Sequence, residues 1–233
     1  MVWLKLNTFT GSAHHVDSIQ THTMENLDRK KHWEKIYTAK EFKDVSWYQP
    51  VPETSLSFLE QCDIPKTAKI IDVGGGDSLL VDFLLEAGYE DISVLDISAH
   101  ALERAQVRLG DKAGKVTWIV ADASSFEPME QYDFWHDRAA FHFFTEEADI
   151  QNYLHVLAKG IQPGGILVLG TFSETGPQKC SGIEIRQYSE RSMTERLKDG
   201  FDKIHCRAID HTTPFDTVQN FIFCSFRKKI IDL

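Results

Sequence analysis

The chain has 233 residues, 42% hydrophobic and 26% charged, so it is long and apolar enough to bury a sizeable core without a disulfide or metal to hold it together. Its 25 basic and 35 acidic side chains leave a net charge of −10. This charge disfavours binding to bulk nucleic acid or to an acidic membrane, because phosphate groups attract Lys- and Arg-rich surfaces.

The four cysteines are scattered and form neither a CxxC pair nor a Cys–His spacing typical of zinc modules; they are Cys62, Cys180, Cys206 and Cys224. We therefore expect reduced, partly buried thiols in a cytoplasmic protein, and no metal site. No apolar run approaches the roughly 20 residues that span a bilayer.

The first 23 residues contain no secretory apolar core and no Arg, so they fit neither a signal nor a transit peptide. We expect a flexible extension there, and a more regular segment from Met24. Trp33, Ile36 and Tyr37 recur at helical spacing and predict a helix. Two prolines separate it from a second short helix, from about Glu53 to Gln61.

Strands and helices alternate in the middle of the chain. Short apolar strands are predicted at 68–73, 91–98, 116–124, 132–141 and 165–173, with helices at 77–90, 98–110 and 145–161 and a QPGG turn at 162–165. Expected helix-end residues are Gly88, Ser98, Gly110 and Thr145. Such alternation is typical of an α/β protein whose parallel sheet is covered on both faces.

The end of the chain has a different pattern. A helix is predicted at 188–201, followed by two strands at 201–215 and 217–228 with only a turn between them. Two strands joined this closely must be antiparallel, because a parallel pair needs a long crossover.

A glycine turn follows the first strand of the alternating region, where α/β sheets bind nucleotide-like ligands. Gly74, Gly75 and Gly76 do not match the GxGxxG pattern of dinucleotide sites in either register. Asp72 and Asp77 flank the turn and would repel a pyrophosphate, which prefers a bare helix N-terminus. A ligand with an ammonium and a sulfonium group suits this turn better, and S-adenosylmethionine is such a ligand.

The next two strands also end in carboxylates. Asp96 comes 20 residues after Gly76 and can accept hydrogen bonds from both ribose hydroxyls. Ile97 can pack on an adenine face, while Asp122, followed by Ala123, can accept from the adenine amino group. A single strand-end Asp is more often a helix cap, but three on successive strands favour a ligand site.

The segments DVGGGDS, VLDIS, VADAS, FWHDR and IQPGGILVLGTF, over about 65–175, resemble the class I S-adenosylmethionine-dependent methyltransferases. The resemblance implies a three-layer, doubly wound α/β sheet of seven strands, mostly parallel, with an antiparallel strand from the C-terminal hairpin. It implies a single domain at 24–229, in which a helical lid at 24–64 covers a Rossmann-like core at 65–229, followed by a tail at 230–233. It also implies that Asp72 and the glycines hold the methionine end, Asp96 the ribose and Asp122 the adenine. Ser78 stands where the family often has a third glycine.

The same resemblance places the end of the fourth strand beside the transferring methyl group. Candidates there for acceptor contact or proton transfer are His136, Asp137, Arg138 and His142; an Arg suits a carboxylate or phosphate on the substrate. The alternative is that Asp137 and Arg138 form a structural ion pair and that one histidine packs in the core.

Three aromatic residues of the lid region are candidates for the acceptor pocket, with core packing as the alternative: Tyr37, Trp47 and Tyr48. The polar, glycine-rich loop at 171–182 is a further candidate for shaping that pocket. A nucleophilic Cys180 is disfavoured because methyl transfer needs none. A metal site at Cys180, His205, Cys206 and His211 is disfavoured because their spacing is irregular.

The sequence thus predicts a methyltransferase that acts on a small molecule or a protein side chain, as a monomer or weak homodimer. Two alternatives remain open. A non-catalytic binding protein with the same fold would show eroded ligand positions, whereas all three Asp positions are present. An NAD-dependent oxidoreductase would need a GxGxxG turn and a Tyr-x-x-x-Lys or similar constellation, neither of which we find.

Overall fold

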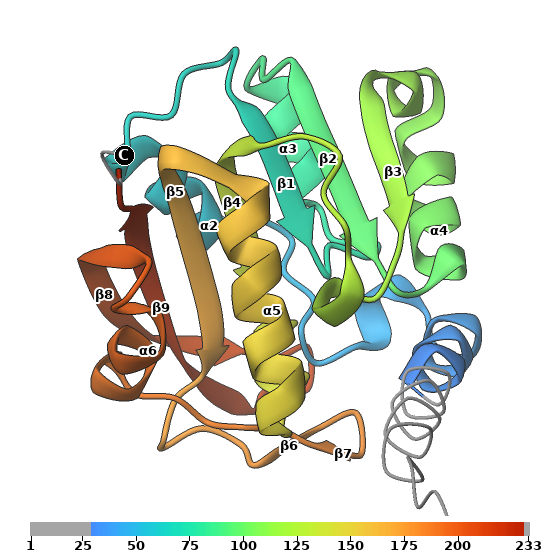
Figure 1. Ribbon diagram of the computed structural model, residues 1–233. Coiled ribbons are helices and arrows are strands. Elements are labelled where there is room, and N and C mark those ends of the chain that lie inside the picture. Colours follow the sequence, from blue (N-terminus) through green and yellow to red (C-terminus); the bar gives the residue numbers. More distant parts are fainter. Residues whose placement is uncertain (1–28, 231–233) are drawn as a thin grey trace, which may run out of the picture.

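The computed structural model describes residues 29–230, and within them seven strands form one sheet (Figure 1). The expectations for 1–23, 24–28 and 231–233 lie outside the described residues. In chain order the strands of this sheet are β1 (Lys69–Val73), β2 (Asp91–Asp96), β3 (Val116–Val120), β4 (Tyr132–Arg138), β5 (Ile161–Phe172), β8 (Phe201–Thr212) and β9 (Val218–Lys228). Their spatial order is β3-β2-β1-β4-β5-β9-β8.

The first five strands run parallel, and β9 lies antiparallel between β5 and β8. The predicted seven-stranded α/β sheet with an antiparallel strand from a terminal hairpin is therefore confirmed. A separate two-stranded ribbon, β6 (Lys179–Cys180) and β7 (Ile183–Glu184), lies within the polar segment that follows β5.

Helices cover both faces of the sheet. They comprise a helix whose described part is 29–39, α2 (Glu53–Gln61), α3 (Leu80–Glu86), α4 (Ala99–Leu109), α5 (Glu147–Gly160) and α6 (Glu190–Leu197). Short 3-10 helices are η1 (Phe42–Asp44), η2 (Gly110–Lys115), η3 (Ala123–Ser125) and η4 (Phe141–Phe143). Residues of α2, α3 and α4 share one apolar cluster with the sheet, while α5 and α6 share the other.

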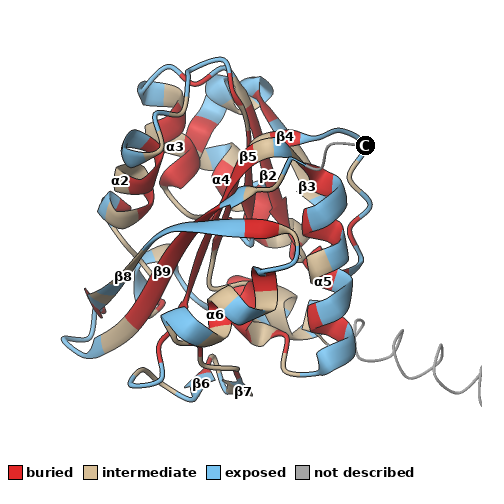
Figure 2. Cartoon of the chain, turned by 60° about the vertical axis from the view of Figure 1, so that its left-hand side comes forward, coloured by how far each residue is buried: buried red, intermediate tan, exposed pale blue. Residues whose placement is uncertain are grey.

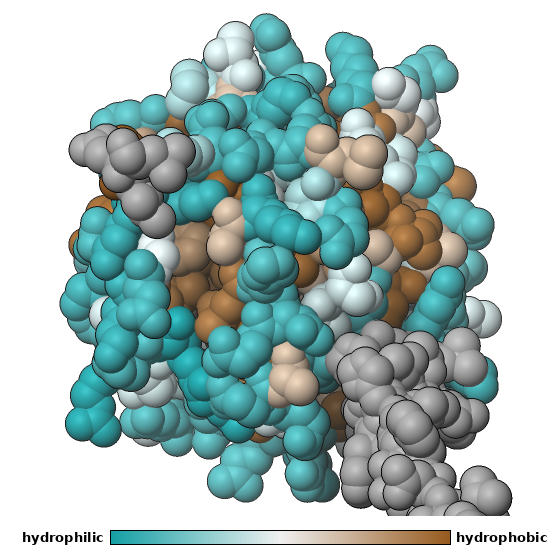
Figure 3. All heavy atoms as spheres, viewed as in Figure 1, coloured by the Kyte–Doolittle hydropathy of each residue, from teal (hydrophilic) through white to brown (hydrophobic). Residues whose placement is uncertain are grey.

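The two apolar clusters follow from strand geometry, because consecutive strand residues point to opposite faces. In β4, Phe134 belongs to the cluster with α2 and α3, whereas its neighbour Trp135 packs with α5. Figure 2 shows the buried residues concentrated on the central strands and the exposed ones along the edge strand β8. Hydrophilic side chains cover most of the face shown in Figure 3.

Most predicted helix ends agree with the structure. The Ser98 side chain accepts a hydrogen bond from the backbone of Ala101 and caps α4, which ends at Gly110. Gly88 lies one residue beyond the C-cap of α3 and has a positive φ of 83°. Thr145 was predicted to cap α5, but the N-cap is Glu146.

The predicted QPGG turn is wrong as a separate element, because β5 already begins at Ile161 and includes these residues. The pairing of β5 with β4 is irregular between Tyr132 and Phe134. Gly164 takes a positive φ of 81°. A local irregularity in the strand therefore accommodates residues that the sequence indicates as a turn.

The expectation of four reduced cysteines is also wrong. Cys206 of β8 and Cys224 of β9 are directly opposite one another and form a disulfide, while Cys62 and Cys180 are free. This pairing depends on the register of the terminal hairpin, which cysteine spacing alone does not reveal. Within residues 29–230 no helix combines the length and apolarity needed to cross a bilayer.

Candidate functional site

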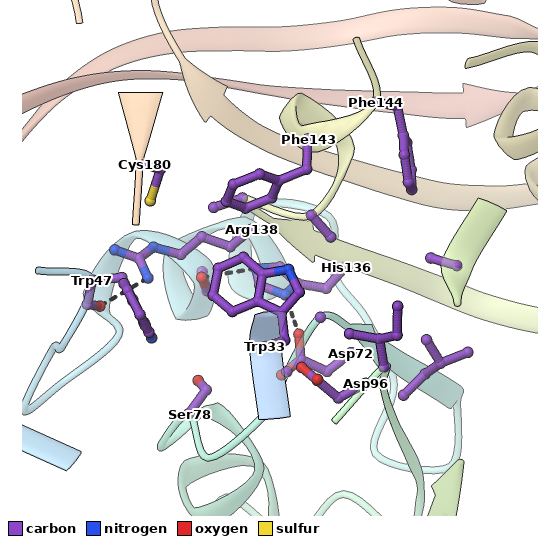
Figure 4. A pocket seen from close by; sticks show the side chains of 18 of the residues that line it. Trp33, Trp47, Asp72, Ser78, Asp96, His136, Arg138, Phe143, Phe144 and Cys180 are labelled. Carbon is purple, nitrogen blue, oxygen red and sulfur yellow. Dashed lines mark hydrogen bonds and ion pairs between the residues drawn. The ribbon is translucent and has the colours of Figure 1, made fainter. Parts of the chain in front are cut away.

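A cleft lies at the carboxyl ends of the parallel strands, with an open space of about 1110 Å³ that includes its solvent-facing part (Figure 4). Its position is where open α/β sheets bind ligands. The predicted site residues that line it are Tyr37, Trp47, Asp72, Gly74, Gly75, Asp96, Ile97, Asp122, Ala123, His136 and Arg138.

The glycine turn at the end of β1 is held tightly against its surroundings. The backbone N–H groups of Gly74 and Gly75 both donate to the carbonyl of Leu95, at 2.8 and 3.2 Å. Gly74 and Gly76 have positive φ angles of 68° and 48°. A Cβ at Gly76 would lie 2.6 Å from the Tyr37 hydroxyl, so a side chain fits there neither sterically nor conformationally.

Asp96 is buried at the end of β2, and its Oδ1 accepts a hydrogen bond from the backbone of Ser98 at 2.8 Å. Burial, followed by the negative charges of Asp77 and Asp72, raises its pKa to about 7. None of the ion pairs formed within residues 29–230 includes Asp96. A ligand that brings hydroxyl donors or positive charge would therefore stabilise its ionised form.

Asp122 both caps a turn and lines the cleft. Its Oδ1 accepts from the backbone and the hydroxyl of Ser124, at 2.9 and 2.7 Å, so the cap interpretation of this residue holds. Its Oδ2 lies 3.3 Å from Arg29, which also forms an ion pair with Asp149. Sequence reasoning gave Arg29 no role, yet it brings positive charge to this end of the cleft.

Asp77 does not contribute to the cleft as the sequence suggested. Its carboxylate forms an ion pair with Arg104 of α4 at 3.0 Å, and it is not among the lining residues. Burial raises its pKa while Arg104 lowers it. The expected repulsion of a pyrophosphate by two carboxylates therefore rests on Asp72 alone, since the charge of Asp77 is compensated.

His136 lies between two hydrogen-bonding partners in the cleft wall. Its Nδ1 is 2.7 Å from Asp72, and its Nε2 is 2.8 Å from the hydroxyl of Ser55 on α2. All three side chains are buried. These two hydrogen bonds fix the orientation of the imidazole and connect the end of β4 to β1 and to α2.

Arg138 projects from β4 on the same face as His136. Its Nη1 donates to the carbonyl of Trp47 at 3.0 Å, and its guanidinium lies 5.3 Å from the ring centre of Phe221. Its Nη2 is buried and has no hydrogen-bond partner. Burial lowers the pKa of Arg138 to about 10, while Asp72 and Cys180 oppose that change.

Asp137 points to the opposite face and does not line the cleft. It is fully buried and accepts hydrogen bonds from the backbones of Ala140 and Phe141 and from the hydroxyl of Tyr153 at 2.6 Å. Burial raises its pKa to about 6. The alternative ion pair between Asp137 and Arg138 is not formed, because neighbouring strand residues face opposite sides.

His142 is also outside the lining, in η4 behind the cleft. It is fully buried, and its Nδ1 accepts from the backbone of Phe172 at 3.3 Å. Burial and the nearby charge of Arg138 lower its pKa to about 3. This histidine therefore matches the core alternative.

Of the three aromatic lid residues predicted for the acceptor pocket, Tyr37 and Trp47 line the cleft and Tyr48 does not. Trp47 packs edge-on against Tyr37 and Trp33, with ring centres 6.2 and 5.9 Å apart, and these three rings line the cleft. Tyr48 packs against Phe42, with ring centres 4.9 Å apart, and does not line the cleft.

Several lining residues were missed by sequence reasoning. They include Arg29, Trp33, Gln49, Ser55, Phe143, Phe144, Gln219 and Phe221. Phe172 and Cys180 also line the cleft, and both belong to the loop at 171–182 that the sequence indicated as a candidate for shaping the pocket. Trp33 carried a usable signal, because it shares a predicted helix face with Tyr37. Gln219 and Phe221 carried none, because they reach the cleft from β9 through the sheet order.

Comparison with known proteins identifies a methyltransferase domain in residues 70–165. Trans-aconitate 2-methyltransferase of Rhizobium leguminosarum bv. trifolii is 30% identical over 112 residues, which are 48% of this chain and 41% of that protein. The chain thus aligns with about two fifths of that relative's length.

Solved structures share the fold over most of both chains. The N-methyltransferase NodS of Bradyrhizobium japonicum, solved with S-adenosyl-L-homocysteine, superposes with a TM-score of 0.65 at 13% identity, covering 85% of this chain and 98% of that one. The Burkholderia thailandensis 1,6-didemethyltoxoflavin-N1-methyltransferase gives a TM-score of 0.63 at 14% identity, covering 97% and 94%. The fold and the methyltransferase domain matched in residues 70–165 both point to a class I S-adenosylmethionine-dependent methyltransferase.

Proposed function

We propose that the protein transfers a methyl group from S-adenosylmethionine to a small-molecule or protein acceptor. The observation that carries this proposal is the acidic end of the cleft. There, buried Asp96 has no ion-pair partner within residues 29–230 and lies near Asp72 and the glycine turn. The charge and hydrogen-bonding capacity of this end suit a cofactor with ribose hydroxyls and cationic groups, so the residues present fit the group.

Each part of the acidic end has a proposed binding role. Asp72 and the glycine turn at 74–76 hold the amino-acid end, and Asp96 accepts hydrogen bonds from the ribose hydroxyls. Asp122, with Ile97 and Ala123 beside it, faces the adenine. When bound, the cofactor supplies a methyl group on a sulfonium centre, whose transfer is an in-line displacement.

The protein's task in such a displacement is alignment and exclusion of water. The aromatic side chains of Trp33, Tyr37 and Trp47 form an apolar wall beside the glycine turn. His136 and Arg138 are the candidates for acceptor contact, because both line the cleft. We assign Asp137 and His142 to support of this wall from behind, since each is buried outside the lining.

We also propose that bulk nucleic acid is not the acceptor, and that the protein works as a monomer or weak homodimer. The net charge of −10 supports the first point, because like charges disfavour a phosphate backbone. Cytoplasmic localisation remains a prediction.

Calorimetric titration with S-adenosylhomocysteine and, separately, with NAD tests the cofactor. We expect binding of the former alone; binding of NAD alone would instead favour an oxidoreductase. A second assay follows labelled methyl from S-adenosylmethionine into a panel of acceptors. Tight cofactor binding without transfer to any acceptor would favour a non-catalytic binding protein with this fold.

A further inference from the structure

Arg138 lies at the opposite end of the cleft from the acidic cluster. Figure 4 shows its guanidinium directed toward Trp47 and Cys180, away from Asp72 and Asp96. One terminal nitrogen donates to the carbonyl of Trp47, whereas the other, Nη2, is buried without a hydrogen-bond partner. No carboxylate of residues 29–230 forms an ion pair with Arg138.

The groups around Arg138 do not neutralise it. Asp72 is the carboxylate that favours its charged form, but Asp72 is engaged with His136 at 2.7 Å. Burial raises the pKa of the Cys180 thiol to about 11, so it is uncharged at neutral pH. Burial lowers the pKa of His142 and His211, which are therefore neutral there as well. Among these groups, Arg138 alone is charged at this end of the cleft, and its charge is positive.

Arg138 is half-buried, but its Nη2 is shielded from solvent, and a shielded guanidinium N–H without a counterion or acceptor is costly and a strong hydrogen-bond donor. The surrounding walls are apolar, because Phe143, Phe172 and Phe221 line the cleft beside Trp47. A ligand with a flat apolar body and one anionic group would pack against these walls and would also neutralise Arg138. A doubly charged phosphate fits less well, because three carboxylates line the same cleft.

We propose that Arg138 binds a carboxylate of the methyl acceptor through Nη2, and that the acceptors are aromatic carboxylic acids. The proposal names the substrate class of the same cleft and rests on the proposed methyltransferase function. Arg138 neutralises the carboxylate, and the aromatic walls hold the apolar body.

The test compares acids with neutral analogues of the same shape. Phenylacetate and indole-3-acetate are titrated against phenylacetamide and indole-3-acetamide, with and without S-adenosylhomocysteine, by calorimetry on the full chain. We expect the acids to bind at least 10-fold more tightly than the amides, since a charge-assisted hydrogen bond is replaced by a neutral one.

The matched variants are Arg138→Gln and Arg207→Gln. Arg207 is also half-buried, lies 5.7 Å from the ring centre of Phe58 and donates to Ser57, but does not line the cleft. We expect Arg138→Gln to weaken acid binding about 10- to 100-fold and to leave the affinity for S-adenosylhomocysteine unchanged. Arg207→Gln should change neither.

Three results would overturn the proposal: equal affinity for acids and amides, undiminished acid binding by Arg138→Gln, or no binding of either acid to the wild type. If Arg138→Gln fails to fold, the acid–amide comparison on the wild type still decides. If S-adenosylhomocysteine does not bind, the proposed function fails, while the titrations without it still report on Arg138.

Discussion

At the scale of single residues, the cleft combines carboxylates and a cation that the protein itself leaves partly uncompensated. Asp96 remains buried although desolvation raises its pKa to about 7, and the half-buried Arg138 keeps its Nη2 shielded although desolvation lowers its pKa to about 10. Such arrangements cost stability and are typical of functional sites. Asp137 differs, because three hydrogen bonds satisfy its carboxylate away from the cleft.

Asp96→Asn tests the cost of that buried charge. The folded-state pKa of Asp96 is raised, so its favourable contribution to stability is complete at low pH and is lost as the pH rises through about 7. The neutral variant does not suffer this loss. Urea denaturation without ligand should show the variant gaining about 2–4 kcal/mol over the wild type between pH 5 and pH 8.

The same substitution should weaken binding of S-adenosylhomocysteine at least 10-fold at pH 8, because the ionised acceptor is lost. The exposed Asp111→Asn is the control and should change neither quantity. A variant that binds the ligand as well as the wild type would remove Asp96 from the site.

Tyr153→Phe tests the assignment of Asp137 to structure. The Tyr153 hydroxyl donates to Asp137 and accepts from the indole nitrogen of Trp135 at 3.1 Å, so its removal leaves two buried polar groups unsatisfied. We expect a loss of about 1–3 kcal/mol in the free energy of unfolding, with unchanged affinity for S-adenosylhomocysteine. Weaker ligand binding without a loss of stability would return Asp137 to the site.

At the scale of elements, the helix at 29–39 lines the cleft and is held by hydrogen bonds to α4. The Glu34 carboxylate accepts hydrogen bonds from the Ser98 hydroxyl and from the backbones of Ala99 and His100, at the start of α4. Arg104 of α4 donates to the carbonyls of Tyr37 and Lys40, at the other end of the helix. These contacts hold Trp33 and Tyr37 against the glycine turn.

Glu34→Ala should release this helix. The variant removes a carboxylate from the N-terminus of α4, where it caps backbone donors and favours the helix dipole. We expect faster amide hydrogen exchange in 29–39 than in β4 and a loss of about 1–3 kcal/mol in stability. Glu41→Ala is the control, because Glu41 makes no side-chain capping bond. Unchanged exchange in 29–39 would show that other contacts hold the helix.

Local patterns predicted the elements and most of the acidic end, but not the whole cleft. The strand-end positions of Asp72, Asp96 and Asp122 follow from alternation of strands and helices, which one sequence displays. The sides to which Asp137 and Arg138 point depend on β4 pairing between β1 and β5. The roles of Gln219 and Phe221 depend on the insertion of β9 beside β5, which is a long-range pairing.

At the scale of the molecule, the terminal hairpin both completes the sheet and forms part of the cleft. β9 pairs with β5 over residues 166–172 and with β8 along nearly its whole length. The disulfide joins β8 to β9 within this hairpin. Disulfides are uncommon in reducing compartments, so the cysteines no longer support the predicted cytoplasmic location.

Reduction of the Cys206–Cys224 bond tests its contribution to the hairpin. The two residues are 18 positions apart, and closing a loop of that size in the unfolded chain is worth up to about 3 kcal/mol. We expect dithiothreitol to lower Tm by about 3–10 °C, because a chain of this size loses roughly 2–4 °C per kcal/mol. Cys206→Ser/Cys224→Ser should reproduce the shift and be insensitive to dithiothreitol, whereas Cys62→Ser should respond as the wild type does. Since β9 carries Phe221 into the cleft, the reduced protein should also bind phenylacetate more weakly; an unchanged Tm and affinity would show that strand pairing alone fixes the hairpin.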